Sequence, residues 1–253
     1  DASASAAGKG AYAARIALDS IEIRNKHRTD RIRPTSVSLH TDSAATRAEA
    51  ASGDLSLTFS TPQSADSLIA ALTRSARALA GQIDAQSIDM EQLKPALPDF
   101  ALRVSAGPDN ILNSLLKSRK IAFDALNAEG ANCDSLPVSI RLRTEGLAYG
   151  NVVLDTVTAD IRQNGKRLEY ALGLANAPGN LDNIARAGLY GHLVRNTGQA
   201  NLYQRNRAGR EGFRFGLDVT WTDSLVRASV TPPDPLFGFE HGLQRRQSRR
   251  PSG

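Results

Sequence analysis

Apolar and polar residues alternate along most of this 253-residue chain. The clearest stripe has five apolar residues at every second position: Phe213, Phe215, Leu217, Val219 and Trp221. A second stripe has the same spacing: Leu168, Tyr170, Leu172 and Leu174. Successive side chains of a strand point to opposite faces of its sheet, so both stripes predict strands with one apolar and one polar face.

The alternation predicts strands on both sides of a helical segment. Residues 15–60 are predicted to form an antiparallel β meander, and residues 97–240 to form mostly strands separated by turn signals such as Asn164-Gly165. Between them, apolar residues recur every three or four positions from Pro62 to Ile83, which predicts an amphipathic helix, capped by Thr61, within a helical insert at residues 61–96. In the later segment, Asp109 is predicted to cap a short helix.

The two ends of the chain lack a clear period. Residues 1–14 are mostly small, and we interpret them as a linker or a frayed start. Because the chain begins with Asp1 rather than Met, we expect a fragment whose anchor or export signal lies in sequence outside it. Residues 241–253 form a basic tail, which we interpret as a solvated or non-native terminus; the alternative is a tail that binds phosphate or anionic lipid.

Charge and cysteine content exclude several classes of protein. The formal net charge is +5, and the four arginines of the tail supply most of it, so the rest of the chain is nearly neutral and we expect no nucleic-acid partner. Cys133 is the only cysteine, which excludes an internal disulfide and a thiolate metal cluster from this chain alone. We interpret Cys133 as a loop thiol.

The residues that commonly carry catalysis show no active-site pattern. The four histidines are scattered, and none has metal-ligand spacing to another ligand: His27, His40, His192 and His241. Neither a phosphate-binding Walker loop nor a G-x-S-x-G elbow is present. Candidate acids such as Asp155 and Asp160 lie at polar strand positions or in turns, where solubility explains them. We therefore expect no enzyme activity, no cofactor and no metal.

A sheet of alternating strands must cover its apolar face. With few helices, the options are a second sheet, a closed barrel or a curled groove. The aromatic residues show no belt spacing of the kind that outer-membrane barrels carry. A tightly packed sandwich and an open groove both remain compatible with the two stripes.

Four segments within residues 97–240 carry a resemblance to a known family. They are Pro98 and Phe100 ahead of an SAGPDN helix cap, the run LDTVTADIRQ, the turn NAPGN, and PPDPLFGFE at the end. In these segments the chain resembles the TamB-like translocation and assembly module family, in the long form of Bacteroidetes-type bacteria. The resemblance implies a mainly β fold: an extended antiparallel sheet curled into a groove, a β-taco or half-pipe, with a few short inserted helices.

The resemblance also implies a function. A TamB-like protein is a non-enzymatic periplasmic protein of the bacterial envelope, held to the inner membrane by an anchor that this fragment lacks. It aids phospholipid transport to the outer membrane, protein assembly and secretion there, or both. Its expected partners are phospholipid acyl chains and an outer-membrane β-barrel of the TamA or BamA type.

Under this resemblance, the nine residues of the two stripes would line a lipid groove. The alternative reading of the whole chain is a surface β-solenoid or adhesin, with a packed interior and a polar face that binds a ligand.

Overall fold

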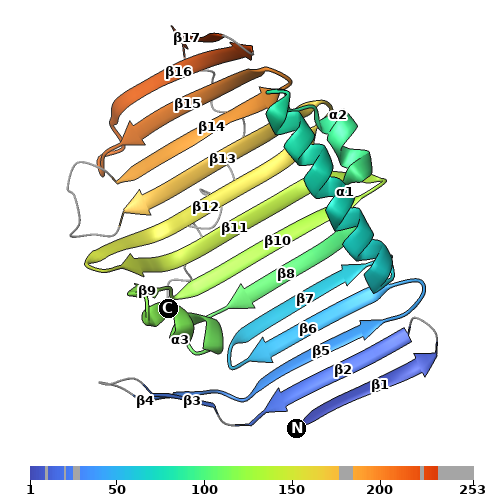
Figure 1. The fold of residues 1–253 in the computed structure, drawn as a ribbon. Helices are drawn as coiled ribbons and strands as arrows, with labels where there is room; N and C mark the ends of the chain where they lie inside the picture. The colour runs from blue at the N-terminus through green and yellow to red at the C-terminus, as the bar shows by residue number, and fades with distance from the viewer. Residues whose placement is uncertain (9–10, 20, 25–28, 177–184, 223–224, 233–253) are drawn as a thin grey trace.

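One large antiparallel sheet dominates the structure, a computed structural model that describes residues 1–8, 11–19, 21–24, 29–176, 185–222 and 225–232 (Figure 1). The sheet has 15 strands and is not closed into a barrel. Each strand in its main path pairs with its sequence neighbours, interrupted only by a small two-stranded hairpin and the helices. The mainly β fold class predicted from the sequence is confirmed, with the sheet curled into a groove.

The main path follows the order β1, β2, β5, β6, β7, β8, β10, β11, β12, β13, β14, β15, β16 and β17. The bounds of its strands are Ala2–Gly8, Ala11–Leu18, Thr35–Thr41, Thr46–Ser52, Leu55–Thr61, Phe100–Ala106, Ala125–Cys133, Leu136–Tyr149, Val152–Asn164, Arg167–Asn176, Arg186–Val194, Thr197–Arg205, Glu211–Thr222 and Leu225–Thr231. Short strand β9 (Ile121–Ala122) adds to β11, and β3 (Ile21–Arg24) pairs with β4 (Thr29–Ile32) in a separate hairpin.

One sequence-based prediction about the organisation of the chain is wrong. Residues 1–14 are neither a linker nor a frayed start, because β1 and the first part of β2 lie there and pair in register. Their small side chains carry little β signal, so pairing with the neighbouring strand decides their conformation. The predicted meander and the later strands belong to one sheet, since β7 pairs directly with β8, and the helical segment is an insert between these two strands, as predicted. The basic tail at residues 241–253 lies outside the described residues.

The helical insert lies at one end of the strands. It contains α1 (Ala65–Asp84), α2 (Met90–Leu93) and the 3-10 helix η1 (Lys94–Ala96), and α1 runs along the ends of several strands on one face of the sheet (Figure 1). Ser64, rather than the predicted Thr61, caps α1 by accepting from the Ser67 N–H. None of the described helices is long and apolar enough to span a bilayer.

The insert is tied to three hairpin turns that are distant in sequence. Arg195, in the turn between β14 and β15, forms a two-way backbone bridge with Ile88 and an ion pair with Asp89. Lys166, in the turn between β12 and β13, pairs with Glu91. Lys94 donates to backbone carbonyls in and next to the turn between β10 and β11. These links fix the insert along one rim of the sheet.

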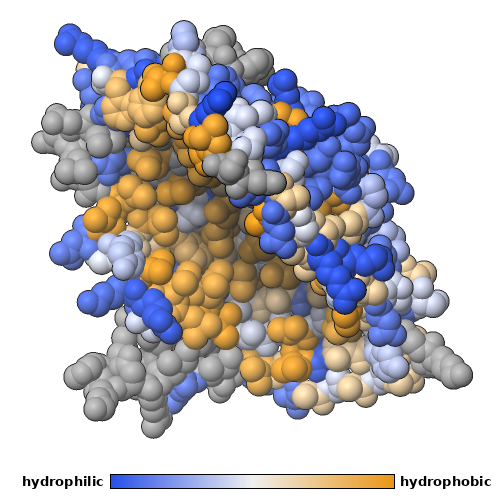
Figure 2. Space-filling model, turned by 45° about the horizontal axis from the view of Figure 1, so that its top comes forward, coloured by the Kyte–Doolittle hydropathy of each residue, from blue (hydrophilic) through white to orange (hydrophobic). Residues whose placement is uncertain are grey.

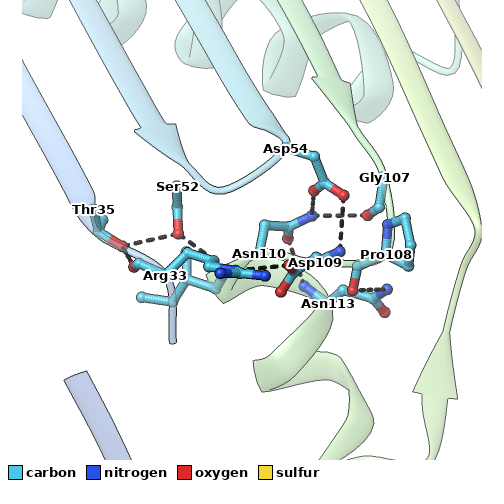
Figure 3. Close-up of polar contacts among 10 residues, drawn as sticks. Arg33, Thr35, Ser52, Asp54, Gly107, Pro108, Asp109, Asn110 and Asn113 are labelled. Carbon is cyan, nitrogen blue, oxygen red and sulfur yellow. Dashed lines mark hydrogen bonds and ion pairs between the residues drawn. The ribbon is translucent and has the colours of Figure 1, made fainter. Parts of the chain in front are cut away.

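A polar cluster holds a third helix, α3 (Ile111–Lys117), at the opposite ends of the strands (Figures 1 and 3). Asn110, not the predicted Asp109, is its N-cap, and its amide also donates to the Asp54 carboxylate at 2.6 Å. Asn113 is fully buried and exchanges hydrogen bonds with both backbone groups of Phe123. The SAGPDN segment is therefore a structural corner that joins the turn between β6 and β7 to α3.

The Asp54 carboxylate makes this corner sensitive to acid. Partial burial works against its charge, but hydrogen bonds from Asn110 and from the backbone N–H groups of Asp109 and Gly107 outweigh it, so the pKa of Asp54 lies below its ordinary value. A carboxyl whose pKa is lower in the folded than in the unfolded state stabilises the fold at pH values above its unfolded-state pKa. This stabilisation is lost as the pH falls through the folded-state pKa.

We therefore expect the urea midpoint of the protein to fall as the pH is lowered from 5 towards 3, and to fall less steeply in Asp54→Asn. Asp42 also has a lowered pKa, through hydrogen bonds from the backbone N–H groups of Ala44 and Ala45 in a separate turn, so Asp42→Asn should flatten the slope by its own, independent amount. If Asp54→Asn and the wild type lose stability with the same slope, Asp54 does not contribute to the acid sensitivity.

Candidate binding groove

Most of the apolar side chains of the sheet lie on one face. Residues directly opposite each other in an antiparallel pair point to the same face, so the register can be followed from strand to strand. One row of facing residues crosses all fourteen strands of the main path: Ala4, Ala14, Leu39, Ala48, Phe59, Leu102, Gly130, Ile140, Ile161, Tyr170, Gly191, Ala200, Leu217 and Val230. None of them is charged.

A second row runs beside the first. It crosses the strands from β1 to β16: Ala2, Ile16, Val37, Ala50, Leu57, Val104, Ala128, Leu142, Ala159, Leu172, Leu189, Leu202 and Phe215. We call the two rows together the apolar band. Neighbouring strands are ~4.8 Å apart, so the band follows a path of roughly 60 Å along the sheet.

Solvent reaches much of this band. Several of its side chains remain substantially exposed, with Leu172 at 45% and Phe215 at 39%, and Leu174, next to the band on β13, is 37% exposed. Figure 2 shows the hydrophobic side chains gathered in a hollowed surface of the molecule. Among the described residues the only other sheet is the β3–β4 hairpin, so no second sheet packs on this face. The stripes therefore do not fill a sandwich, and the packed interior required by the solenoid or adhesin alternative is not seen in this part of the chain.

All nine predicted lining residues lie on this one face. The register brings the two stripes into the same rows, because Leu172 faces Leu189, Leu189 faces Leu202, and Leu202 faces Phe215. Strands β13 and β16 are therefore separated by two strands and are not adjacent. Tyr170 and Leu217 lie in the first row in the same way, and Leu168, Leu174, Phe213, Val219 and Trp221 continue the same face at the strand ends.

Two of the nine residues are covered by the helical insert. Leu168 packs against a small core formed by Met90, Leu93 and Val138. Trp221 donates its indole N–H to the backbone carbonyl of Gln86, just after α1. These two residues attach the insert to the sheet. Of the other seven, Leu172, Leu174, Phe213 and Phe215 are exposed, and the remaining three are partly buried.

Helix α1 carries a second exposed apolar surface, separate from the apolar band. It is anchored through a face of small and polar residues, in which Ala71 is buried and Ser75 donates to the Ala96 carbonyl. Its large apolar residues lie about a quarter-turn away at helical spacing and are exposed: Ile69, Leu72, Leu79 and Ile83. The signal for this stripe was present in the sequence, but the sequence did not show that the stripe stays uncovered.

Tyr170 is the one residue of the band with a polar side-chain group. Its ring lies over Gly191, and its hydroxyl donates to the Gln199 carbonyl at 2.9 Å. Burial raises the pKa of this hydroxyl, which keeps it protonated at neutral pH. Because the hydroxyl is already hydrogen-bonded, the band presents a surface with no charge and no unpaired side-chain donor.

The close approach of Tyr170 makes Gly191 sensitive to substitution. A Cβ atom at Gly191 would overlap the Gln199 carbonyl and touch the Tyr170 hydroxyl. We expect Gly191→Ala to lower the free energy of unfolding by about 2 kcal/mol through overpacking. Gly81 in α1 is the matched control: a Cβ there meets nothing within 4 Å, so Gly81→Ala should raise stability by about 0.5–1 kcal/mol. Urea unfolding of both variants tests this, and equal behaviour of the two would refute the packing argument.

The opposite face of the sheet carries the charges. Arg103 and Glu129 lie 3.3 Å apart on neighbouring strands, as do Arg141 and Asp160, and a third pair joins Arg162 and Glu169 at 2.7 Å. Partial burial opposes the charge of Glu169, but hydrogen bonds from Asn164 and Arg162 lower its pKa overall. These partly exposed pairs contribute little to stability, but they keep this face soluble.

Acidic, histidine and cysteine side chains do not form a metal site in the described part of the chain. No group of three or more His, Cys, Asp or Glu side chains there could hold a metal ion. Cys133 lies at the end of β10 near the Ser135 hydroxyl, whose hydrogen bond lowers the pKa of the thiol. Among the described residues, the apolar band is the most extensive surface made of one kind of side chain.

Comparison with known proteins gives no relative for this chain. No protein-family model, no curated protein and no solved structure matches it.

Proposed function

We propose that this protein is a non-enzymatic lipid conduit of the bacterial envelope, of the TamB type. The observation that carries the proposal is the uncharged, solvent-accessible band that crosses the whole sheet. The sequence resemblance to the TamB-like family supports the same function independently. In this proposal the chain belongs to a periplasmic protein anchored in the inner membrane, which acts with an outer-membrane β-barrel partner in lipid transport, protein assembly, or both.

The physical reason for such a band is the cost of moving an acyl chain through water. Each exposed CH₂ group costs about 0.8 kcal/mol, so a chain of ~16 carbons meets a barrier of more than ~10 kcal/mol. A continuous apolar surface lowers this barrier along its whole length without any catalytic group. Half of the ~30 Å hydrocarbon core of a bilayer is the depth of one acyl chain, so the band has room for several chains end to end.

The band also needs an occupant on energetic grounds. Soluble monomers seldom expose contiguous apolar patches beyond a few hundred Å², and larger ones mark binding surfaces. A polar ligand would gain nothing from a surface without charges or free donors. Acyl chains, by contrast, need only apolar contact.

The direct test is native mass spectrometry of the protein purified without detergent, with bound lipids extracted and identified. We expect phospholipid to remain bound at a defined stoichiometry. A lipid-free, monodisperse protein that also fails to take up phospholipid from vesicles would refute the proposal.

A further inference from the structure

The apolar band cannot hold the headgroup of a phospholipid. A phosphate placed in the band would lose its hydration without gaining a charged or hydrogen-bonding partner, which is strongly unfavourable. If acyl chains lie in the band, as the proposed function requires, the phosphate must sit at its rim. The rim near α1 is occupied by the insert and its ion pairs, which leaves the opposite rim for the phosphate (Figure 1).

One turn on that opposite rim is strongly basic. The turn between β15 and β16 and its flanks carry four arginines and one acid within ten residues: Arg205, Arg207, Arg210, Glu211 and Arg214. Arg186 at the start of β14 adds a fifth cation, because it faces Arg205 in the register. Arg186 and Arg205 both alternate with residues of the apolar face and so point to the other face, which leaves Arg207 and Arg210 as the cations at the tip of the turn.

Local hydrogen bonds hold this turn in a defined shape. The backbone N–H of Asn206 donates to the Arg210 carbonyl, while the side-chain oxygen of Asn206 accepts from the Arg210 N–H. Gly209 adopts φ +75°, a conformation that favours glycine. The register shifts between Gln204 and Arg205, and such a bulge re-aims the side chains that follow. Arg207 and Arg210 are exposed at this turn.

The basic turn adjoins an aromatic part of the apolar face. Phe213 follows Arg210 by three residues, is 44% exposed, and stacks on Phe215 with ring centroids 6.0 Å apart. Arg214 points to the other face and pairs with Glu211 at 3.0 Å. Cations and exposed apolar rings thus meet at one rim, which is the combination that an anionic amphiphile requires.

We propose that the turn between β15 and β16 binds the phosphate of a phospholipid, through Arg207 and Arg210, while its acyl chains lie against Phe213 and Phe215. Arginine suits this role because its planar guanidinium donates two parallel hydrogen bonds to phosphate. This site deepens the proposed function and rests on it.

The test compares two lipids that share the same two acyl chains, phosphatidylglycerol and diacylglycerol. Detergent-free protein is incubated with each, and the bound lipid is counted by native mass spectrometry. We expect the wild type to retain about ten times more phosphatidylglycerol than diacylglycerol, a preference that weakens as salt is raised. Arg207→Glu/Arg210→Glu should abolish this preference and leave diacylglycerol binding unchanged.

Arg74→Glu/Arg77→Glu is the matched control. It makes the same change of charge at exposed positions of α1, on the other rim, and should keep the wild-type preference. Arg207→Gln/Arg210→Gln removes the charges without adding acids, and should give the same loss of preference if the charge reversal misfolds the turn.

The outcomes separate the two proposals. The phosphate site is refuted if the wild type binds both lipids equally, or if Arg207→Glu/Arg210→Glu and Arg207→Gln/Arg210→Gln both keep the preference for phosphatidylglycerol. Neither result contradicts the proposed lipid conduit. A wild type that binds neither lipid overturns the conduit itself.

Discussion

Leu172→Asp/Phe215→Asp should lower bound phospholipid by at least about a hundredfold. Both residues lie in the second row of the apolar band and are substantially exposed, so the substitutions leave the sheet intact. Each new carboxylate would have to be desolvated beneath an acyl chain with no partner, which costs several kcal/mol. Native mass spectrometry of the detergent-free protein measures the loss.

The control places the same charges on the other face. Thr58 and Thr220 are exposed and point away from the band, since each alternates with band-face residues along its strand. Thr58→Asp/Thr220→Asp should retain lipid like the wild type. If both double variants lose lipid to the same extent, general charge and not the band determines binding.

Asn113→Ala should reduce the free energy of unfolding by about 3 kcal/mol. The Asn113 side chain is fully buried, donates to the carbonyls of Phe123 and Pro108, and accepts from the Phe123 N–H. Truncation leaves the buried N–H and carbonyl of Phe123 without the Asn113 partner, and each such group costs about 1–3 kcal/mol. The shift in the urea unfolding midpoint tests this prediction.

Ser114→Ala is the neighbouring control in α3. The Ser114 side chain is only half-buried, and Ala favours a helix, so stability should stay within about 0.5 kcal/mol of the wild type. A small effect of Asn113→Ala would mean that the corner is hydrated or relaxes easily, and that α3 does not depend on it.

The alternation in the sequence was enough to predict the faces of the strands. Phe213 and Leu172 point to the apolar face because the period of a strand is two, and no tertiary contact can change that without a bulge. The order of the strands also follows from short connections between neighbours. The sequence could not show that the apolar face stays open to solvent, because a stripe that fills a sandwich and one that lines a groove have the same spacing.

Long-range links were the other part that could not be predicted. Nothing in the sequence joins Gln86 to Trp221 or Asp89 to Arg195, which meet only after the intervening strands have stacked in register. The caps of α1 and α3 were misplaced by one to three residues, because several Ser, Thr, Asp and Asn side chains compete for each cap position and geometry selects one. The arginines near Arg207 are visible in the sequence. The sequence does not show that they lie with Phe213 on the rim opposite the helical insert.

The one-layer arrangement of the sheet has a consequence for how the protein unfolds. Most strands contact only the two beside them, so cooperativity passes along the chain from neighbour to neighbour, as in repeat proteins. The helical insert is the exception, because links from α2 and from the segment between α1 and α2 reach the β12–β13 and β14–β15 turns and Trp221 of β16. In the described part of the chain, strands β1 and β2 have no such link to the insert and can fray while the linked strands stay folded. Local unfolding should therefore cost less free energy at the β1 end of the sheet than at the strands from β12 to β16.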